Sequence, residues 1–462
     1  AASRGVGSCV ARRDTRIAGG HGMAIGDQRD LDLARKNLVS YFGRVLPGAR
    51  DVDVANLAAP GMGFSNETLL LDLSYVRDGK RHDEPLVIRV RPKAMVFPEY
   101  DLRRQFDVMR MLEPTDVPVP HMRWFEDGED VLGASFYVMD RIDGVVPQDY
   151  PPYHVAGFCT EMTPTQRASL WWDGVDKLAR IHRLDWKKLG FGFLERPDLG
   201  TTPLAQQLEY YRRYLAWGAE GKPQPTVDAG LAWLLANQPK DEPVALSWGD
   251  SRVGNMIFRD ARCVAVLDWE MVALGNPEQD LGWWLFLDWH HSGGIGVERL
   301  EGFPSREETI ARWEQLVGRR AEHLHYYEAF AAFRFAVIMI RIAQLVREAG
   351  LPAPDDMATN NTCCCAPTSC CPRRQLSASR PSNLFRKRGT NNTTANRPRS
   401  IVYRRKVDAP MPLFPASSGC WTELPSLPVF PARRPAAEFP ACMLKQVLRV
   451  CCRRQQQRSR MQ

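Results

Sequence analysis

The pattern of the sequence changes abruptly near Met357, and this change limits the part of the chain that can fold. Of 61 Lys and Arg residues, 19 lie from Met357 onward beside three acids, which leaves 42 basic and 51 acidic residues before it. The stretch 357–462 is rich in Pro, Ser and Cys and has no amphipathic period that could build a core. We therefore expect a folded body over residues 30–356 and a disordered, basic tail over 357–462 that resembles an aberrant extension.

The composition of the body excludes several classes of protein. An acidic body does not fit a nucleic-acid binder, which needs a basic face. The residues before Met357 include three cysteines, Cys9, Cys159 and Cys263, which are too few for a disulfide framework. We see no apolar run of the ~18 residues that a membrane span requires. We expect a cytoplasmic protein with no membrane partner and an unstructured extension over 1–29, where a transit peptide is the alternative; the oligomeric state stays open.

The body divides into two regions with different periodicity. The first, 30–141, combines helical patterns at 30–45 and 100–112 with strand patterns at 69–76 and 85–91 and a further strand pair around Gly128. After Gly144 the pattern is helical at 170–186, 204–218, 227–238 and 309–350, with a strand–turn–strand unit at 244–269. This order predicts an α+β protein with a small antiparallel-sheet N-lobe (30–141), a mostly helical C-lobe (142–356) and a cleft between them.

The segment 246–284 carries the most specific motif. Asp250 and Asn255 have the D-x-x-x-x-N spacing of a kinase catalytic loop, in which the acid orients an acceptor hydroxyl and the amide holds Mg²⁺. A short hairpin then returns Asp268, a hard oxygen ligand suited to Mg²⁺, to the same cleft. Taken singly, these residues could be turn formers or helix caps. Together, they predict phosphoryl transfer from ATP.

This segment resembles the aminoglycoside phosphotransferase-like family, also called the phosphotransferase enzyme family. The branch most similar to it contains the kinase-like domains attached to some acyl-CoA dehydrogenases, and the resemblance extends over 31–350. It implies a protein-kinase-like two-lobed fold that uses ATP and Mg²⁺. It also implies that Asp250 is the catalytic base, that Asn255 and Asp268 are the metal ligands, and that Asp280 braces the catalytic loop, where a helix cap is the alternative.

The resemblance also assigns nucleotide contacts in the N-lobe and the connector between the lobes. Arg89 replaces the usual Lys that pairs with phosphate, and Gln105 replaces the Glu that would pair with this cation. Trp248 stands where the catalytic loop commonly has His. An ordinary hairpin turn, an exposed strand cation and core packing are the alternatives for these positions. The expected nucleotide-binding residues are Gly61, Gly63, Ser65, Arg89, Gln105, Met139, Asp140 and Ile142.

We therefore expect transfer of the γ-phosphate of ATP to a hydroxyl of a small molecule. The tract expected to line the acceptor pocket is more aromatic than acidic, which favours a less cationic acceptor than an aminoglycoside, and the family branch suggests one like a hydroxyacyl-CoA. The alternatives are a catalytically weak, nucleotide-binding pseudokinase or scaffold and, less favoured without a DFG or APE motif, a protein kinase. The candidate acceptor contacts, with core packing as their alternative, are Trp283, Trp284, Asp288, Trp289, His290, His291, Tyr326 and Tyr327.

Overall fold

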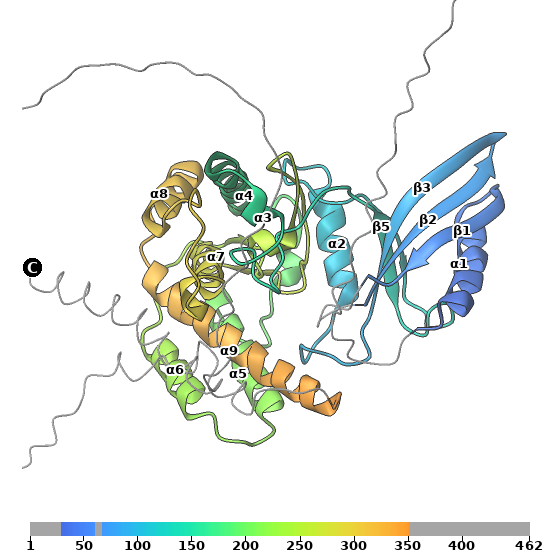
Figure 1. Cartoon of the computed structure of the whole chain (residues 1–462). Helices are drawn as coiled ribbons and strands as arrows, with labels where there is room; N and C mark the ends of the chain where they lie inside the picture. The colour runs from blue at the N-terminus through green and yellow to red at the C-terminus, as the bar shows by residue number, and fades with distance from the viewer. Residues whose placement is uncertain (1–28, 61–66, 351–462) are drawn as a thin grey trace, which may run out of the picture. The chain divides into compact units, whose positions relative to one another are not determined.

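The computed structural model describes residues 29–60 and 67–350, and within them an antiparallel sheet precedes a mostly helical region (Figure 1). The predicted two-lobed α+β fold is thereby confirmed. The expectations for residues 1–28 and for the tail over 357–462 lie outside the described residues, whereas Arg29, the last residue of the expected extension, forms an ion pair with Glu67 at 2.6 Å.

The N-lobe sheet has five antiparallel strands in the order β1-β2-β3-β5-β4. The strand patterns predicted at 69–76 and 85–91 are β2 and β3, which a two-residue turn at 78–79 joins into a hairpin. The sequence analysis missed β1. The bounds are β1 Arg50–Ala58, β2 Glu67–Arg77, β3 Lys80–Val90, β4 Met122–Glu126 and β5 Phe136–Asp140, with helices α1 Leu31–Val45 and α2 Leu102–Leu112.

The two faces of the sheet belong to different hydrophobic clusters. Leu86, Ile88 and Val90 of β3 pack in the cluster that contains the buried side of α1. Val87, on the opposite face, packs with α2 and with residues of the C-lobe. Because side chains alternate along a strand, Arg89 lies on the Val87 face and is directed toward the lobe that carries the predicted catalytic loop.

The C-lobe surrounds two short strand pairs with helices. Strands β6 and β9 form one antiparallel pair, and β7 and β8 form the hairpin predicted after the catalytic loop. The helices are α3 Phe158–Glu161, α4 Pro164–Arg183, α5 Pro203–Ala219, α6 Pro225–Ala236, α7 Glu278–His290, α8 Arg306–Val317 and α9 Leu324–Glu348; the strands are β6 Ala245–Ser247, β7 Met256–Arg259, β8 Arg262–Val266 and β9 Ala273–Gly275.

The helical pattern predicted over 309–350 is two helices. Gly318 ends α8 with φ +79°, a left-handed conformation that glycine adopts without strain. The expectation that no stretch could span a membrane was also wrong by length and composition, because α9 passes both criteria. However, 72% of its most apolar window is buried within the protein, as in a core helix that packs against α5, α6 and α7.

The close contact between α7 and α9 depends on Gly282. A Cβ atom at this position would lie 2.8 Å from the carbonyl carbon of Tyr327 on α9. The two backbones therefore approach to a distance that only glycine permits, and this approach fixes the helix that carries Asp280 and Trp283.

We predict that Gly282→Ala destabilises the protein by about 1–3 kcal/mol, because the added methyl group must push α7 away from α9. Gly230→Ala on α6 is the matched control, since its Cβ would meet Phe333 at 4.0 Å, an ordinary contact. Urea unfolding of both variants checks this, and the control is expected to be as stable as the parent or slightly more stable. Equal midpoints for the two variants would contradict the proposed close contact.

Candidate active site

Asp250 lies in the tight loop between β6 and β7, and the structure places Asn255 against it. Asn255 Nδ2 donates to Asp250 Oδ2 at 2.7 Å and to the Asp250 carbonyl at 3.0 Å. Gly249, with φ +92°, makes the turn possible, because a Cβ there would lie 2.0 Å from the carbonyl oxygen of Met271. The predicted base and the predicted amide ligand are thus neighbours whose orientation is fixed by the loop itself.

Asp280, at the start of α7, accepts hydrogen bonds from the segment that leads into this loop. Its Oδ1 accepts from Ser247 Oγ at 2.7 Å and from the backbone N–H of Gly249 at 2.9 Å, while its Oδ2 accepts from the backbone N–H of Trp248 at 2.7 Å. Its side chain is fully buried, and its backbone carbonyl accepts from Ser251 Oγ at 2.7 Å. This geometry is that of a brace for the catalytic loop.

His182 on α4 supplies a further hydrogen bond to the same carboxylate, with Nε2 3.1 Å from Asp280 Oδ2. On its other side, Trp313 Nε1 donates to His182 Nδ1 at 2.9 Å. An indole N–H can only donate, so Nδ1 is an acceptor and the proton of this neutral imidazole is on Nε2. Burial alone would raise the pKa of Asp280, but His182 and the loop donors outweigh it, and the pKa lies below its ordinary value.

Asp268 follows β8 and lies beside the catalytic loop. The N–H of Leu267 donates to the Asn255 carbonyl at 2.9 Å, which joins the two segments. Asp268 has φ +59°, and its Oδ1 is buried without a hydrogen-bond partner among the described residues. Burial raises the pKa of Asp268; the Arg89 guanidinium opposes this and the Asp250 carboxylate adds to it, so that the net shift is upward. This carboxylate therefore lacks the donors that would compensate its charge.

Arg89 and Gln105 are both buried near this site, but the structure does not pair them. Arg89 Nη1 donates to Thr68 Oγ1 at 2.9 Å, and its Nη2 lies 3.9 Å from Asp268 Oδ2. Gln105 is 2% exposed on α2, and no hydrogen bond joins it to Arg89 in the described part of the chain. The cation thus bridges β2, β3 and the predicted metal ligand without the helix partner that the sequence analysis considered.

The connector between the lobes begins at the end of β5. Met139 is buried and pairs with Val87 across the sheet, and Asp140 accepts from Arg123 Nε at 2.5 Å. Ile142 follows the strand and is half-buried. The Gly-rich turn with Gly61, Gly63 and Ser65 lies outside the described residues, so its predicted contact with phosphate stays a prediction.

Arg252 is a site residue that the sequence analysis missed. Its Nε donates to Asp250 Oδ2 at 3.0 Å, and its Nη1 bonds to Asp149 in the loop after β5. Burial raises the pKa of Asp149, but Arg252 and His291 outweigh it and lower the pKa overall. The sequence did contain a signal for Arg252, because it is a cation only two positions after the predicted base Asp250. Nothing in the sequence connected Asp149 to it, since the two lie 103 positions apart.

The aromatic tract after Asp280 contains one residue that contacts the predicted base. Trp283 Nε1 donates to Asp250 Oδ1 at 2.7 Å. By contrast, Trp284 packs edge-on against Trp171. Tyr326 donates to the Leu234 carbonyl, and Tyr327 donates to Glu242.

Asp288 accepts from Tyr153, His154 and Arg299, and these contacts connect the loop after β5 to α7. His290 and His291 are largely buried, and burial lowers the pKa of both.

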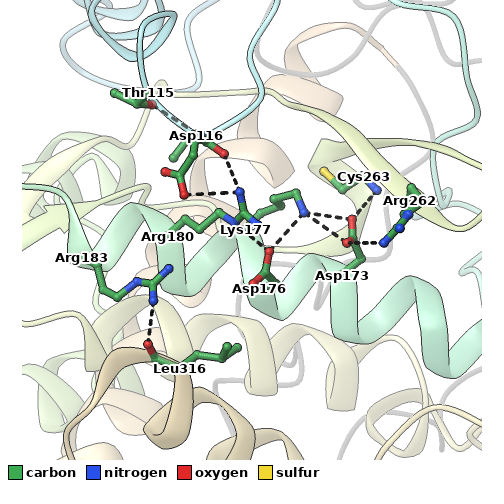
Figure 2. A network of polar contacts seen from close by, with 11 residues as sticks. Thr115, Asp116, Asp173, Asp176, Lys177, Arg180, Arg183, Arg262, Cys263 and Leu316 are labelled. Atoms are coloured by element: carbon green, nitrogen blue, oxygen red, sulfur yellow. Dashed lines mark hydrogen bonds and ion pairs between the residues drawn. The ribbon is translucent and has the colours of Figure 1, made fainter.

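A polar network on the outer side of the β7–β8 hairpin fixes it to α4 (Figure 2). Asp173 Oδ2 accepts from the backbone N–H of Cys263 at 2.7 Å, and Lys177 Nζ lies 3.1 Å from both oxygens of Asp173. Arg180 extends the network to the carbonyl of Asp116 at 3.2 Å. The hairpin that carries Asp268 is therefore attached to the helix that carries His182.

Asn255 and Asp268 are the side chains that could hold a divalent metal ion. Asp268 Oδ1, which has no partner in the described part of the chain, fits such a ligand, because a buried carboxylate oxygen needs a cation or a donor. In the described segments, no group of three or more His, Cys, Asp or Glu side chains could hold a metal ion. A two-residue set nevertheless suits Mg²⁺, which usually keeps waters and takes further oxygens from phosphates.

The chain is similar to known proteins over most of its folded part. The family model described as the phosphotransferase enzyme family matches residues 58–323. Acyl-CoA dehydrogenase family member 11 of Rattus norvegicus is 26% identical over 349 residues, which cover 72% of this chain and 42% of that protein. Family member 10 of Mus musculus is 27% identical over 290 residues, which cover 60% of this chain and 25% of that protein. The chain thus spans less than half of the length of these relatives.

A solved structure agrees with the family. A protein of Ralstonia eutropha, described as a candidate aminoglycoside phosphotransferase, superposes with a TM-score of 0.54 at 27% identity, covering 70% of this chain and 92% of its own. Together, the family model and this structure support small-molecule phosphotransferase activity. Because the matched residues make up more than half of the chain and include the catalytic loop and its brace, the protein belongs to the phosphotransferase enzyme family.

Proposed function

We propose that the protein transfers the γ-phosphate of ATP to a hydroxyl group of a small molecule, in a reaction that depends on Mg²⁺. The observation that carries this proposal is the fixed carboxylate of Asp250, which accepts from Asn255 and Trp283. It lies in a loop that the Leu267 N–H joins to the segment of Asp268. Phosphoryl transfer requires little covalent chemistry from the protein; it requires positioning and charge compensation. The loop supplies the positioning, and the surrounding cations and amide supply the charge compensation.

Asp250 has the role of the base that orients the acceptor hydroxyl and takes its proton. Hydrogen bonds from Asn255, Arg252 and Trp283 hold the carboxylate in one orientation, which a base needs in order to meet a hydroxyl at a fixed angle. Asn255 and Asp268 would hold Mg²⁺, which supplies charge neutralisation for the triphosphate oxygens when bound. Arg89, across from Asp268, is placed to compensate phosphate charge from the N-lobe side.

For the acceptor, we favour a hydroxyacyl-CoA-like metabolite over an aminoglycoside. The surroundings of Asp250 support this, since Trp283 contacts it directly and Arg252 adds positive charge beside it. A polycationic aminoglycoside would instead need uncompensated carboxylates. The names of the curated relatives, which are acyl-CoA dehydrogenase family members, agree with an acyl-CoA-like acceptor.

We predict that Asp250→Asn lowers kcat by about 10²–10⁴-fold, the usual contribution of a general base, while nucleotide binding is retained. The measurement is ADP release with Mg²⁺-ATP across a library of hydroxyl compounds. Asp260→Asn is the matched control, because Asp260 is exposed at the tip of the β7–β8 hairpin, in a left-handed conformation that Asn tolerates. Equal turnover by Asp250→Asn and the parent would instead support the pseudokinase alternative.

Asp268→Asn tests the metal site separately. Asn tolerates the left-handed backbone of Asp268, so the change removes charge with little strain. We expect the melting temperature without ligands to stay equal or rise, because a buried carboxylate without donors is lost. We also expect loss of the additional thermal stabilisation that Mg²⁺ gives to the ATP-bound parent. An unchanged response to Mg²⁺ in a thermal-shift titration would remove Asp268 from the ligand set.

Asp280→Asn tests the brace. Both oxygens of Asp280 accept from two donors each, and an amide must turn its own N–H groups toward one of these pairs. We expect a loss of about 3 kcal/mol or more in the free energy of unfolding, since buried donors are left unpaired. Urea unfolding measures it, with Asp260→Asn, at the exposed tip of the β7–β8 hairpin, as the control that should leave the midpoint unchanged. A similar midpoint for both variants would reject the brace.

A further inference from the structure

Arg334, on α9, is a buried cation with unmet hydrogen-bonding capacity. The residue is 1% exposed, and its Nε and Nη2 have no hydrogen-bond partner among the described residues. Within 29–60 and 67–350, Arg334 forms no ion pair with a carboxylate, and its other polar contact is a hydrogen bond with the Tyr211 hydroxyl. A guanidinium keeps its charge at every physiological pH, so these N–H groups remain buried and charged.

Aromatic rings surround this guanidinium. Its Cζ lies 4.4 Å from the ring centroid of Trp283, 5.1 Å from that of Phe330 and 5.8 Å from that of Tyr211. The negative faces of these rings attract the cation. They compensate part of its charge, but a ring face cannot replace the in-plane oxygen acceptors that the fork of N–H groups requires.

The Trp283 ring contacts both the guanidinium and the predicted catalytic base. The Trp283 ring that Arg334 contacts is the one whose Nε1 donates to Asp250 Oδ1 at 2.7 Å. The Tyr211 hydroxyl interacts with both groups. Burial raises its pKa, the charge of Arg334 and a hydrogen bond with it oppose the rise, and the Asp250 carboxylate adds to the rise. A molecule whose hydroxyl meets Asp250 could therefore place a second group, a few bonds away, at Arg334.

We propose that Arg334 binds an anionic group, a carboxylate or a phosphate, of the hydroxyl acceptor and so makes the enzyme selective for anionic hydroxy compounds. The inference rests on the proposed transfer of phosphate to a hydroxyl group. It names a free hydroxy acid or hydroxyalkyl phosphate as the acceptor class, in place of the hydroxyacyl-CoA, whose thioester has no free carboxylate near the hydroxyl. A planar anion would accept from Nε and Nη2 in the bidentate manner that a guanidinium favours. Because the group is enclosed, a side chain of the aromatic wall must turn aside to admit the anion, a change common at binding sites.

The charge preference of the parent enzyme is the first test. Acceptors of equal chain length are compared in the ADP-release assay: ω-hydroxycarboxylates, ω-hydroxyalkyl phosphates, diols and amino alcohols. We expect kcat/KM for one of the two anionic series to exceed that for the diols by about 10- to 100-fold, the range for hydrogen bonds between charged groups. The series with the larger value tells a carboxylate site from a phosphate site. Diols or amino alcohols used as well as both anionic series would overturn the inference.

Arg334→Met is the second test, because it removes the charge and keeps an unbranched side chain. We expect KM for the preferred anionic acceptor to rise about 10- to 100-fold, KM for the diol to stay unchanged, and the melting temperature to be maintained. Arg341→Met is the matched control. Arg341 is on the same helix and stacks on Trp217 at 4.6 Å, but it pairs with Glu348 and the Met95 carbonyl. An equal change in KM for anionic and neutral acceptors would assign Arg334 a structural role only.

Two further measurements keep this inference separate from the proposed function. If Arg334→Met does not fold, Arg334→Lys replaces it, and a point charge without the fork should weaken the anionic acceptor alone. If no acceptor is phosphorylated, thermal protection by ω-hydroxycarboxylates or ω-hydroxyalkyl phosphates is compared between the parent and the variant. If the compounds protect the parent and not the variant, the anion site is supported and the transfer reaction is rejected. If they protect neither protein, or both equally, the anion site is rejected. Transfer without charge preference retains the proposed function and rejects the anion site.

Discussion

The buried carboxylate of Asp280 is the contact on which the geometry of the site depends. It joins the start of α7 to the segment after β6 through Ser247, Trp248 and Gly249, and to α4 through His182. A fully buried charge is stable only when donors surround it, so these elements cannot separate without leaving the charge unpaired. The position of the catalytic loop is therefore coupled to the packing of the helical lobe.

Charge compensation around the loop is distributed over both lobes. Arg252 lies between Asp250 and Asp149, and Arg89 faces Asp268 from the sheet. Each cation thus contacts a carboxylate that comes from a different segment of the chain. In contrast, one oxygen of Asp268 has no donor among residues 29–60 and 67–350. A buried carboxylate oxygen without a donor costs stability, and this cost is consistent with the metal site that we propose at Asp268.

The sequence predicted the local features because they depend on spacing. Asp250 and Asn255 belong to one tight loop, and the polar turn between two apolar strands specified the β2–β3 hairpin, so these features followed from short-range chemistry. The prediction of side-chain partners was incomplete where it depended on the residue at a single position. Gln105 occupied the expected place of a partner for Arg89, but the structure directs Arg89 to Thr68 and Asp268 instead. Periodicity also joined α8 and α9, because it does not detect the left-handed turn at Gly318.

The order of a mixed lobe before a helical lobe, and the identity of the loop residues, were therefore determined by pattern and spacing along the chain. The tertiary structure alone decided which distant groups meet. Asp149 reaches Arg252, and Trp283 connects Asp250 to the cation of Arg334. The physical reason is that such contacts arise only when helices pack. At Gly282, for example, the close approach of the α7 and α9 backbones determines which side chains of the two helices become neighbours. Periodicity shows which face of a helix is buried, but it does not show what that face contacts.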